Sequence, residues 1–110
     1  MTAHRHRPFA VAVRSELGPT GGTADLSGEL DISSIAQLWD ALSALCGEGY
    51  RYVVLDLSEL DFLDAAGLGV LVRADRLFRE AGATLALTGL RPSQQRLLEI
   101  TGLDRALRVE

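Results

Sequence analysis

The hydrophobic positions near the start of the chain recur at every second residue. Phe9, Val11 and Val13 follow this spacing, which is typical of a β-strand. The segment LGPTGG at residues 17–22 then supplies a proline and three glycines, a composition typical of a turn. A second strand is predicted over residues 23–27. The two strands are expected to form a hairpin.

The hydrophobic spacing then changes to intervals of three and four residues. Four apolar residues would share one face of a helix in this region: Ile35, Leu38, Leu42 and Leu45. Ser34 lies three residues before Gln37, a spacing that predicts a capping box at the start of this helix. Gly47 and Gly49 are predicted to end it.

Residues 50–60, YRYVVLDLSEL, form a nearly continuous apolar run, which predicts a strand buried on both faces of a sheet. Asp64 is placed to cap a second helix, which Gly82 would end. Six residues form the apolar stripe of that helix: Leu68, Leu71, Val72, Ala74, Leu77 and Phe78.

The remaining sequence predicts a strand, a short helix and a last short strand. The strand is ATLALTGL at 83–90 and the helix is PSQQRLLEITGL at 92–103, with Ser93 as its cap and Gly102 just past its end. Residues 106–110 form the last strand. Alternating strands and helices predict an α/β fold, a mixed four- to five-stranded sheet with amphipathic helices packed on it. Residues 1–8 are expected to be a flexible N-terminus and 9–110 a single domain.

Composition narrows the class of protein. The chain has 110 residues, of which 47% are hydrophobic and 24% charged, as expected of one globular domain. Its longest apolar runs, such as Tyr52 to Leu55, are too short to span a membrane, and the start of the chain lacks the apolar core of a secretory signal. We therefore expect a cytoplasmic protein without direct membrane insertion.

The charge pattern argues against nucleic acid as a partner. The net charge is −4, so no basic surplus exists to displace counterions from a phosphate backbone. All eleven basic residues are arginine, which excludes lysine-dependent chemistry such as a Schiff base or a phosphate-loop lysine.

No catalytic or metal-binding constellation is predicted. His4 and His6 lie in the polar N-terminus, and no other histidine accompanies them. Cys46 falls near the end of an amphipathic helix and is interpreted as a packing residue rather than a nucleophile. The glycines at 67 and 69 lack the spacing of a nucleotide-binding loop. We predict that the protein is not an enzyme and needs no cofactor.

Carboxylates gather where the predicted strands end. Asp31 falls at the start of the first helix, Asp56 near the end of a strand, and Asp61 and Asp64 in the turn after it. In parallel sheets this edge is where ligands and partners meet the fold. Helix capping is the simpler role for Asp31 and Asp64, and capping and binding are compatible.

Three motifs, in this order, resemble those of the STAS domain, the fold of bacterial anti-sigma factor antagonists. They are SGELDISSIAQL, YVVLDLSELDFLDAAGLGVLV and RPSQQRLLEITGLDRALRV. The resemblance extends from about Phe9 to Val109, nearly the whole chain. It implies a transcription regulator that binds an anti-sigma factor, usually a serine kinase with a GHKL-type ATP-binding fold, and so frees a sigma factor.

The resemblance also implies a partner-binding surface, formed by the loop after the second strand and by the turn that leads into the second helix. In this sequence the matching residues are Gly28, Glu29, Asp31, Ser33, Ser34, Asp61, Asp64, Ala65, Ala66, Gly67, Leu68 and Leu71. In the family, the kinase phosphorylates a serine within a D-S-S-G or D-S-x-G turn, and the added charge abolishes binding.

This sequence departs from the family at that serine. Alignment of Asp64 and Gly67 with the motif places Ala65 at the phosphoacceptor position, and alanine has no hydroxyl to phosphorylate. Ser58 is the nearest hydroxyl upstream, but it matches no family acceptor. The resemblance therefore predicts binding that is insensitive to phosphorylation at this turn.

Other functions are compatible with the same motifs. A STAS protein can be a subunit of an ABC-type (lipid) transporter complex, bound to its ATPase on the cytosolic side. Nucleotide hydrolysis is the least supported reading, since no phosphate loop is present. A homodimer is also possible through an exposed edge strand near residues 9–14.

Overall fold

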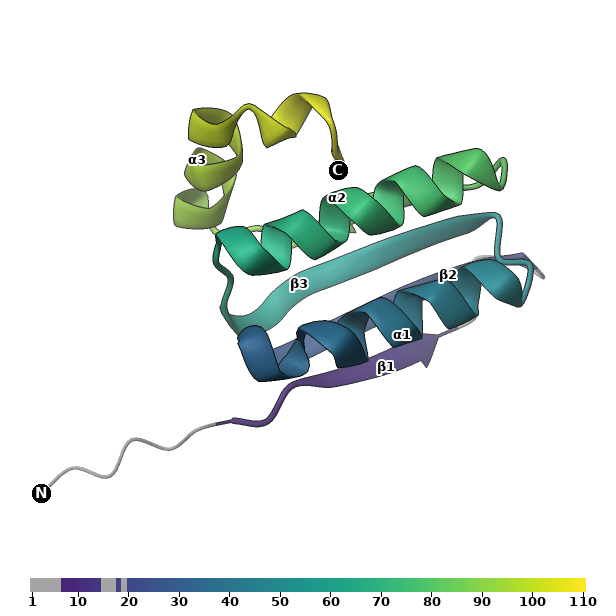
Figure 1. Cartoon of the computed structure of the whole chain (residues 1–110), viewed down its shortest axis with the longest axis horizontal. Coiled ribbons are helices and arrows are strands. Elements are labelled where there is room, and N and C mark those ends of the chain that lie inside the picture. Colours follow the sequence, from purple (N-terminus) through teal and green to yellow (C-terminus); the bar gives the residue numbers. More distant parts are fainter. Residues whose placement is uncertain (1–6, 15–17, 19) are drawn as a thin grey trace, which may run out of the picture.

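The computed structural model describes residues 7–14, 18 and 20–110 (Figure 1). The elements follow in the order β1 (Ala10–Arg14), β2 (Gly21–Glu29), η1 (Ile32–Ser34), α1 (Ile35–Gly47), β3 (Tyr52–Phe62), α2 (Ala65–Glu80), β4 (Thr84–Thr88), α3 (Pro92–Thr101), η2 (Leu103–Arg105) and β5 (Arg108–Val109). Here η marks a 3-10 helix. The predicted α/β architecture, a mixed sheet with helices packed on it, is confirmed.

The five strands form one sheet in the order of the sequence, β1-β2-β3-β4-β5. β1 pairs antiparallel with β2, which confirms the predicted hairpin, and the other three pairs are parallel. β2 is two residues longer at each end than the predicted 23–27. β1 forms one edge of the sheet, with most of its residues exposed.

Both long helices, α1 and α2, lie on the same face of the sheet (Figure 1). β3 accordingly alternates between buried and half-exposed residues: Leu55 and Leu57 are fully buried, whereas Val54 and Asp56 are half-exposed. The prediction that this strand is buried on both faces was therefore wrong. A continuous apolar run does not reveal that only alternate side chains face the helices.

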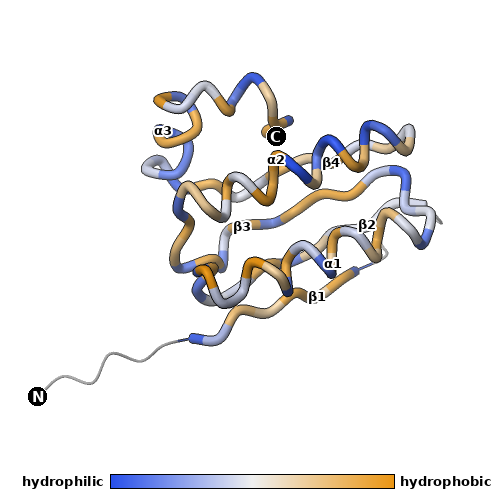
Figure 2. The backbone as a smooth tube through the Cα atoms, in the orientation of Figure 1, coloured by the Kyte–Doolittle hydropathy of each residue, from blue (hydrophilic) through white to orange (hydrophobic). Residues whose placement is uncertain are grey.

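The core lies between the helices and the covered face of the sheet. Hydrophobic segments run along much of β3, and the colour changes repeatedly along α1 and α2, as expected of helices with one apolar face (Figure 2). The predicted stripes are confirmed at the fully buried Leu38, Leu42, Leu71 and Phe78. Cys46 packs half-buried against this core, with its Sγ 3.9 Å from the carbonyl oxygen of Leu77.

Two predicted helix caps are wrong. The Ser34 side chain makes no capping hydrogen bond to α1. The helical segment begins one turn earlier, with η1, and Asp31 is the residue that caps it. For α3, Pro92 occupies the first helical position in place of a Ser93 cap, and the side-chain oxygen of Gln94 accepts a hydrogen bond from the backbone N–H of Arg91. The first N–H groups of a helix have no partner within the helix, so proline, which lacks an N–H, is favoured at the first helical position. The helix therefore starts one residue before Ser93.

Arg7 and Pro8, assigned above to a flexible N-terminus, contact the body of the fold. The carbonyl oxygen of Arg7 accepts a hydrogen bond from Glu29 N at 3.1 Å. The Arg7 side chain forms an ion pair with Asp61, in which Arg7 Nε lies 3.0 Å from Asp61 Oδ2. His4 and His6 lie outside the described residues.

In the described part of the chain, no helix has the length and apolar content that crossing a bilayer requires. No cluster of three or more His, Cys, Asp or Glu side chains within residues 7–14, 18 and 20–110 is arranged to hold a metal ion.

Candidate partner-binding site

The ends of β2 and β3 lie side by side. Glu29 pairs with Phe62 in the parallel register, so the chain leaves both strands at one end of the sheet. In Figure 1 the start of α1 and the turn from β3 into α2 are both found at that end. We call the exposed and half-exposed part of it the carboxyl-end surface, which consists of Asp31, Ile32, Ser33, Asp61, Phe62, Asp64, Ala65 and Ala66.

A carboxylate and a glycine shape the turn from β3 into α2. Asp64 Oδ1 accepts a hydrogen bond from the backbone N–H of Gly67 at 3.0 Å, which makes Asp64 the N-cap predicted from the sequence. Gly67 is buried; a Cβ there would lie 2.8 Å from Leu30 Cδ2 and 3.0 Å from Leu63 Cδ1. The missing side chain lets the start of α2 pack closely on the chain that leaves β2.

Ala65 and Ala66 are the first two residues of α2, and both are exposed. Neither supplies a hydrogen bond to the turn, because the cap uses only Asp64 and the amide of Gly67. A hydroxyl at position 65 would therefore be accessible to an enzyme, whereas the methyl group present there has no atom that can accept a phosphoryl group.

The connection from β2 into η1 has a similar cap with more donors. Asp31 Oδ1 accepts hydrogen bonds from Ser33 N at 3.0 Å and Ser33 Oγ at 2.6 Å. It also accepts one from Ser34 N at 3.3 Å, and Ser34 Oγ in turn accepts the N–H of Asp31 at 3.0 Å. The hydrogen bond from the Ser33 hydroxyl is the main cause that lowers the pKa of Asp31 below its usual value of 3.8.

Several residues that the resemblance placed on the partner surface are structural. Leu68 and Leu71 are fully buried in the core, and Gly67, Gly28 and Ser34 are buried as well. Gly28 has φ +82°, and a Cβ there would lie 2.2 Å from the carbonyl oxygen of Pro8. These five residues hold the two turns to the core, and the exposed residues around them offer most of the surface to a partner.

Ile32 and Phe62 were not among the predicted site residues. Ile32 is 82% exposed and begins η1 after β2, and Phe62 is 49% exposed and ends β3 just before the turn that contains Ala65. A signal in the sequence could have identified them, since each follows a predicted strand and belongs to no apolar helix stripe. Because β2 and β3 end side by side, both residues lie at one end of the sheet, where they are candidates for an interaction surface.

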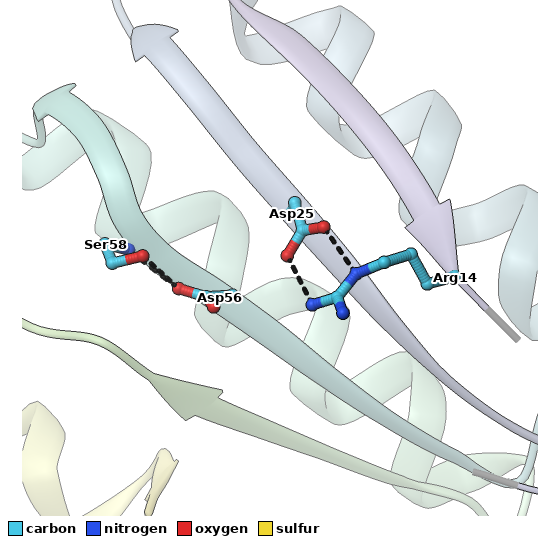
Figure 3. A network of polar contacts seen from close by, with 4 residues as sticks. All are labelled: Arg14, Asp25, Asp56 and Ser58. Carbon is cyan, nitrogen blue, oxygen red and sulfur yellow. Dashed lines mark hydrogen bonds and ion pairs between the residues drawn. The ribbon is translucent and has the colours of Figure 1, made fainter. Parts of the chain in front are cut away.

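The face of the sheet away from the helices carries a separate polar group (Figure 3). Arg14 forms two hydrogen bonds to the carboxylate of Asp25, at 2.7 and 3.0 Å. On β3, Ser58 donates from its hydroxyl to Asp56 Oδ1 at 2.6 Å and from its N–H at 2.9 Å, and this lowers the pKa of Asp56. The Ser58 hydroxyl is thus engaged locally, apart from Ala65.

The sequence of this chain is similar to those of known proteins. The profile of the family described as "Mlab, STAS domain" matches residues 15–109. The protein BtrV of Bordetella bronchiseptica, classed by name with the anti-sigma factor antagonists, is 35% identical over 79 residues, which are 72% of this chain and 68% of BtrV.

Solved structures of similar fold carry related names. An anti-sigma factor antagonist from Mycobacterium paratuberculosis superimposes with a TM-score of 0.80 at 22% identity, over 93% of this chain and 85% of that one. The anti-sigma factor antagonist SpoIIAA, in its unphosphorylated form, gives a TM-score of 0.75 at 19% identity, over 92% of this chain and 88% of SpoIIAA. SpoIIAA of Bacillus has also been solved in a phosphorylated form. At these identities the structures show a shared fold.

Proposed function

The chain belongs to the STAS domain family of anti-sigma factor antagonists, and from that premise we propose that it binds an anti-sigma factor of the GHKL serine-kinase type through its carboxyl-end surface. Binding would free a sigma factor and so regulate transcription. The protein acts as a binding module rather than an enzyme. The observation that carries the proposal is the exposed, capped turn around Ala65, with the exposed Ile32 and Phe62 at the same end of the sheet.

The chemistry of the surface specifies the kind of partner. Ile32 and Phe62 offer apolar area, and Asp31 and Asp64 add carboxylates at the same end of the sheet, where Asp61 is paired with Arg7. A complementary partner would present an apolar pocket with basic residues at its rim, since opposite charges at a rim steer association.

Ala65 removes the phosphate switch from this proposed interface. In the family a phosphoserine at this position adds a charge of about −1.5 to −2. Such a charge would lie next to Asp64 and would have to be desolvated when the partner docks. Because Ala65 lacks the acceptor oxygen, the kinase cannot end the interaction in this way, and we propose that the protein is a constitutive antagonist.

The test is binding to a purified GHKL-type anti-sigma factor with and without ATP. The complex should form and should persist when ATP is added, and labelled phosphate should not appear on the protein. Labelling of the wild-type chain, or loss of the complex with ATP, would contradict the insensitivity.

Charge at the turn gives the sharper test. Ala65→Asp should weaken binding at least tenfold, because the new carboxylate lies in the interface. Ala44→Asp is the matched control: Ala44 is also an exposed alanine on a helix, but it lies near the other end of α1 and should change affinity less than twofold. Equal affinities of both variants would mean that the partner docks elsewhere.

Two other predictions have direct measurements. Co-purification with an ABC ATPase and no kinase would favour the transporter-subunit alternative.

Light scattering during size-exclusion chromatography gives the oligomeric state. A dimer that is lost when proline is placed within the exposed strand β1 would support pairing through that edge.

A further inference from the structure

A pocket of about 340 Å³ lies far from the carboxyl-end surface. Its walls include Asp75 and Arg79 of α2, Thr84 and Leu85 of β4, and Arg105 and Arg108 from the last segment of the chain. Thr84 pairs with Tyr52, the first residue of β3, so the pocket is near the start of the strands, whereas the carboxyl-end surface is at their ends. The volume is at the lower end of the range for small-molecule sites.

The pocket concentrates positive charge in a chain with a net charge of −4. Three guanidinium groups line it against one carboxylate, that of Asp75. In the described part of the chain, the guanidinium of Arg105 has no hydrogen bond or ion pair, and that of Arg108 has only a long contact, Nε to Glu110 Oε2, at 3.7 Å. An excess of cations over carboxylates in the lining favours an anionic ligand.

Asp75 has a positioning role in this arrangement. It is 5% exposed and lies on α2 one turn before Arg79, and its Oδ2 is 2.8 Å from Arg79 Nε. This contact fixes the Arg79 side chain through its Nε and leaves both Nη groups available to another acceptor. A guanidinium held in this way can donate two parallel hydrogen bonds to one oxyanion.

We propose that this pocket binds a phosphate group, either as free orthophosphate or as the phosphate monoester of a small molecule. The excess of two positive charges among the lining side chains matches a phosphate dianion. The arginine forks suit tetrahedral oxyanions, and the Thr84 hydroxyl adds a donor. Leu85 and Leu107 form apolar wall that free phosphate would leave uncovered and that the organic part of a monoester would contact.

The experiment is an NMR titration of the full chain with orthophosphate and, separately, with glycerol 3-phosphate, at constant ionic strength set with chloride. We expect saturable shifts at the amides of Leu85, Ala106 and Leu107. The Arg105→Gln/Arg108→Gln variant should bind at least tenfold more weakly. Arg96→Gln removes a charge from an exposed arginine of α3 outside this pocket and should change affinity less than twofold.

The two ligands distinguish the sources of the phosphate. Tighter binding of glycerol 3-phosphate assigns the site to a monoester that uses the apolar wall, and equal binding assigns it to orthophosphate. Shifts that never saturate, or that are unchanged in the double variant, would overturn the proposal. Arg105 and Arg108 are exposed, so the variant should keep the wild-type thermal midpoint, which circular dichroism checks. The outcome is independent of anti-sigma factor binding, which uses the other end of the sheet.

Discussion

Two aspartates begin helical segments at the same end of the sheet with nearly the same backbone. Asp31 has φ −118° and ψ −174°, and Asp64 has φ −116° and ψ −175°. The sequences that follow differ: ISS after Asp31 and AAG after Asp64. Both turns are capped by the aspartate, yet the first engages hydroxyl groups and the second has none.

The turn from β3 into α2 therefore does not require a hydroxyl at position 65. Asp64 caps α2 with a carboxylate and one backbone N–H, while close packing at Gly67 holds the helix start in place. The two residues between them face solvent, so folding does not decide whether position 65 is serine or alanine.

The largest effect should come from the buried part of the β3–α2 turn. Leu68→Ala leaves a cavity among fully buried side chains and should lower the free energy of unfolding by about 2–5 kcal/mol. Ile32→Ala, at the exposed end of the other turn, should change it by less than about 0.5 kcal/mol. Urea denaturation measures both. A small loss for Leu68→Ala would contradict its core role.

The next effect separates two glycines of α2. Gly67→Ala forces a methyl group against Leu30 and Leu63 and should cost about 1–2 kcal/mol of stability, even after the gain in helix propensity. Gly69→Ala has nothing within 4 Å of the new Cβ and should stabilise the protein by about 0.5–1 kcal/mol. Denaturation midpoints that move in the same direction would refute the close-packing argument.

Loss of the α2 cap should have a smaller effect. Asp64→Ala removes the acceptor of the Gly67 N–H and should cost about 1 kcal/mol. Asp64→Asn keeps a side-chain oxygen at the same place and should retain most of the stability. If both variants lose the same amount, the charge of Asp64 matters more than its hydrogen bond.

A pH titration can show the role of the hydroxyl in the Asp31 turn. Ser33→Ala removes the main cause of the lowered pKa of Asp31, so that pKa should rise toward 3.8. Because the pKa is lower in the folded state, the contribution of Asp31 to stability is complete above about pH 4 and is lost as the pH falls through the folded-state value. NMR titration of the carboxyl group measures the shift. Ser58→Ala is a useful comparison, since it should raise the pKa of Asp56 and leave that of Asp31 unchanged.

The smallest effect on stability should come from restoring the family serine. Ala65→Ser should change the free energy of unfolding by less than about 0.5 kcal/mol, because position 65 is exposed and unused by the cap. Under the proposed function, this variant should also become a substrate of the kinase that binds the protein, detected as labelled phosphate on the variant alone. Ala66→Ser is the control for a hydroxyl one residue later. A clear loss of stability in Ala65→Ser would show that the fold, rather than regulation, selects alanine.

Much of the fold followed from periodicity. The order of elements, the hairpin and the buried stripes of α1 and α2 could be predicted, because side-chain direction repeats with the period of each element. The caps of α1 and α3 could not, since each serine follows a residue at which the helical segment starts earlier: Asp31, which caps η1 before Ser34, and Pro92, the first helical residue before Ser93. A local sequence pattern does not show which of two nearby residues starts the helical segment.

The candidate site was predicted only in part. The sequence placed Asp31, Asp61, Asp64 and Ala65 at the ends of strands, and the structure brings the two turns together. It did not separate exposed from buried members of the motif. Leu68 was assigned both to the apolar stripe of the second helix and to the partner surface, and the structure buries it in the core, whereas Phe62 was overlooked and is 49% exposed.

The sequence by itself determined the missing hydroxyl at Ala65, since no folding can supply an oxygen that the side chain lacks. It also determined the helix and strand faces, which depend on local spacing. The exposure of each residue in the motif around Asp64 depends on tertiary packing and could not be read from the sequence. The packing of helices and strands also brings Arg79 of α2 into one pocket with Arg105 and Arg108 from the last segment of the chain.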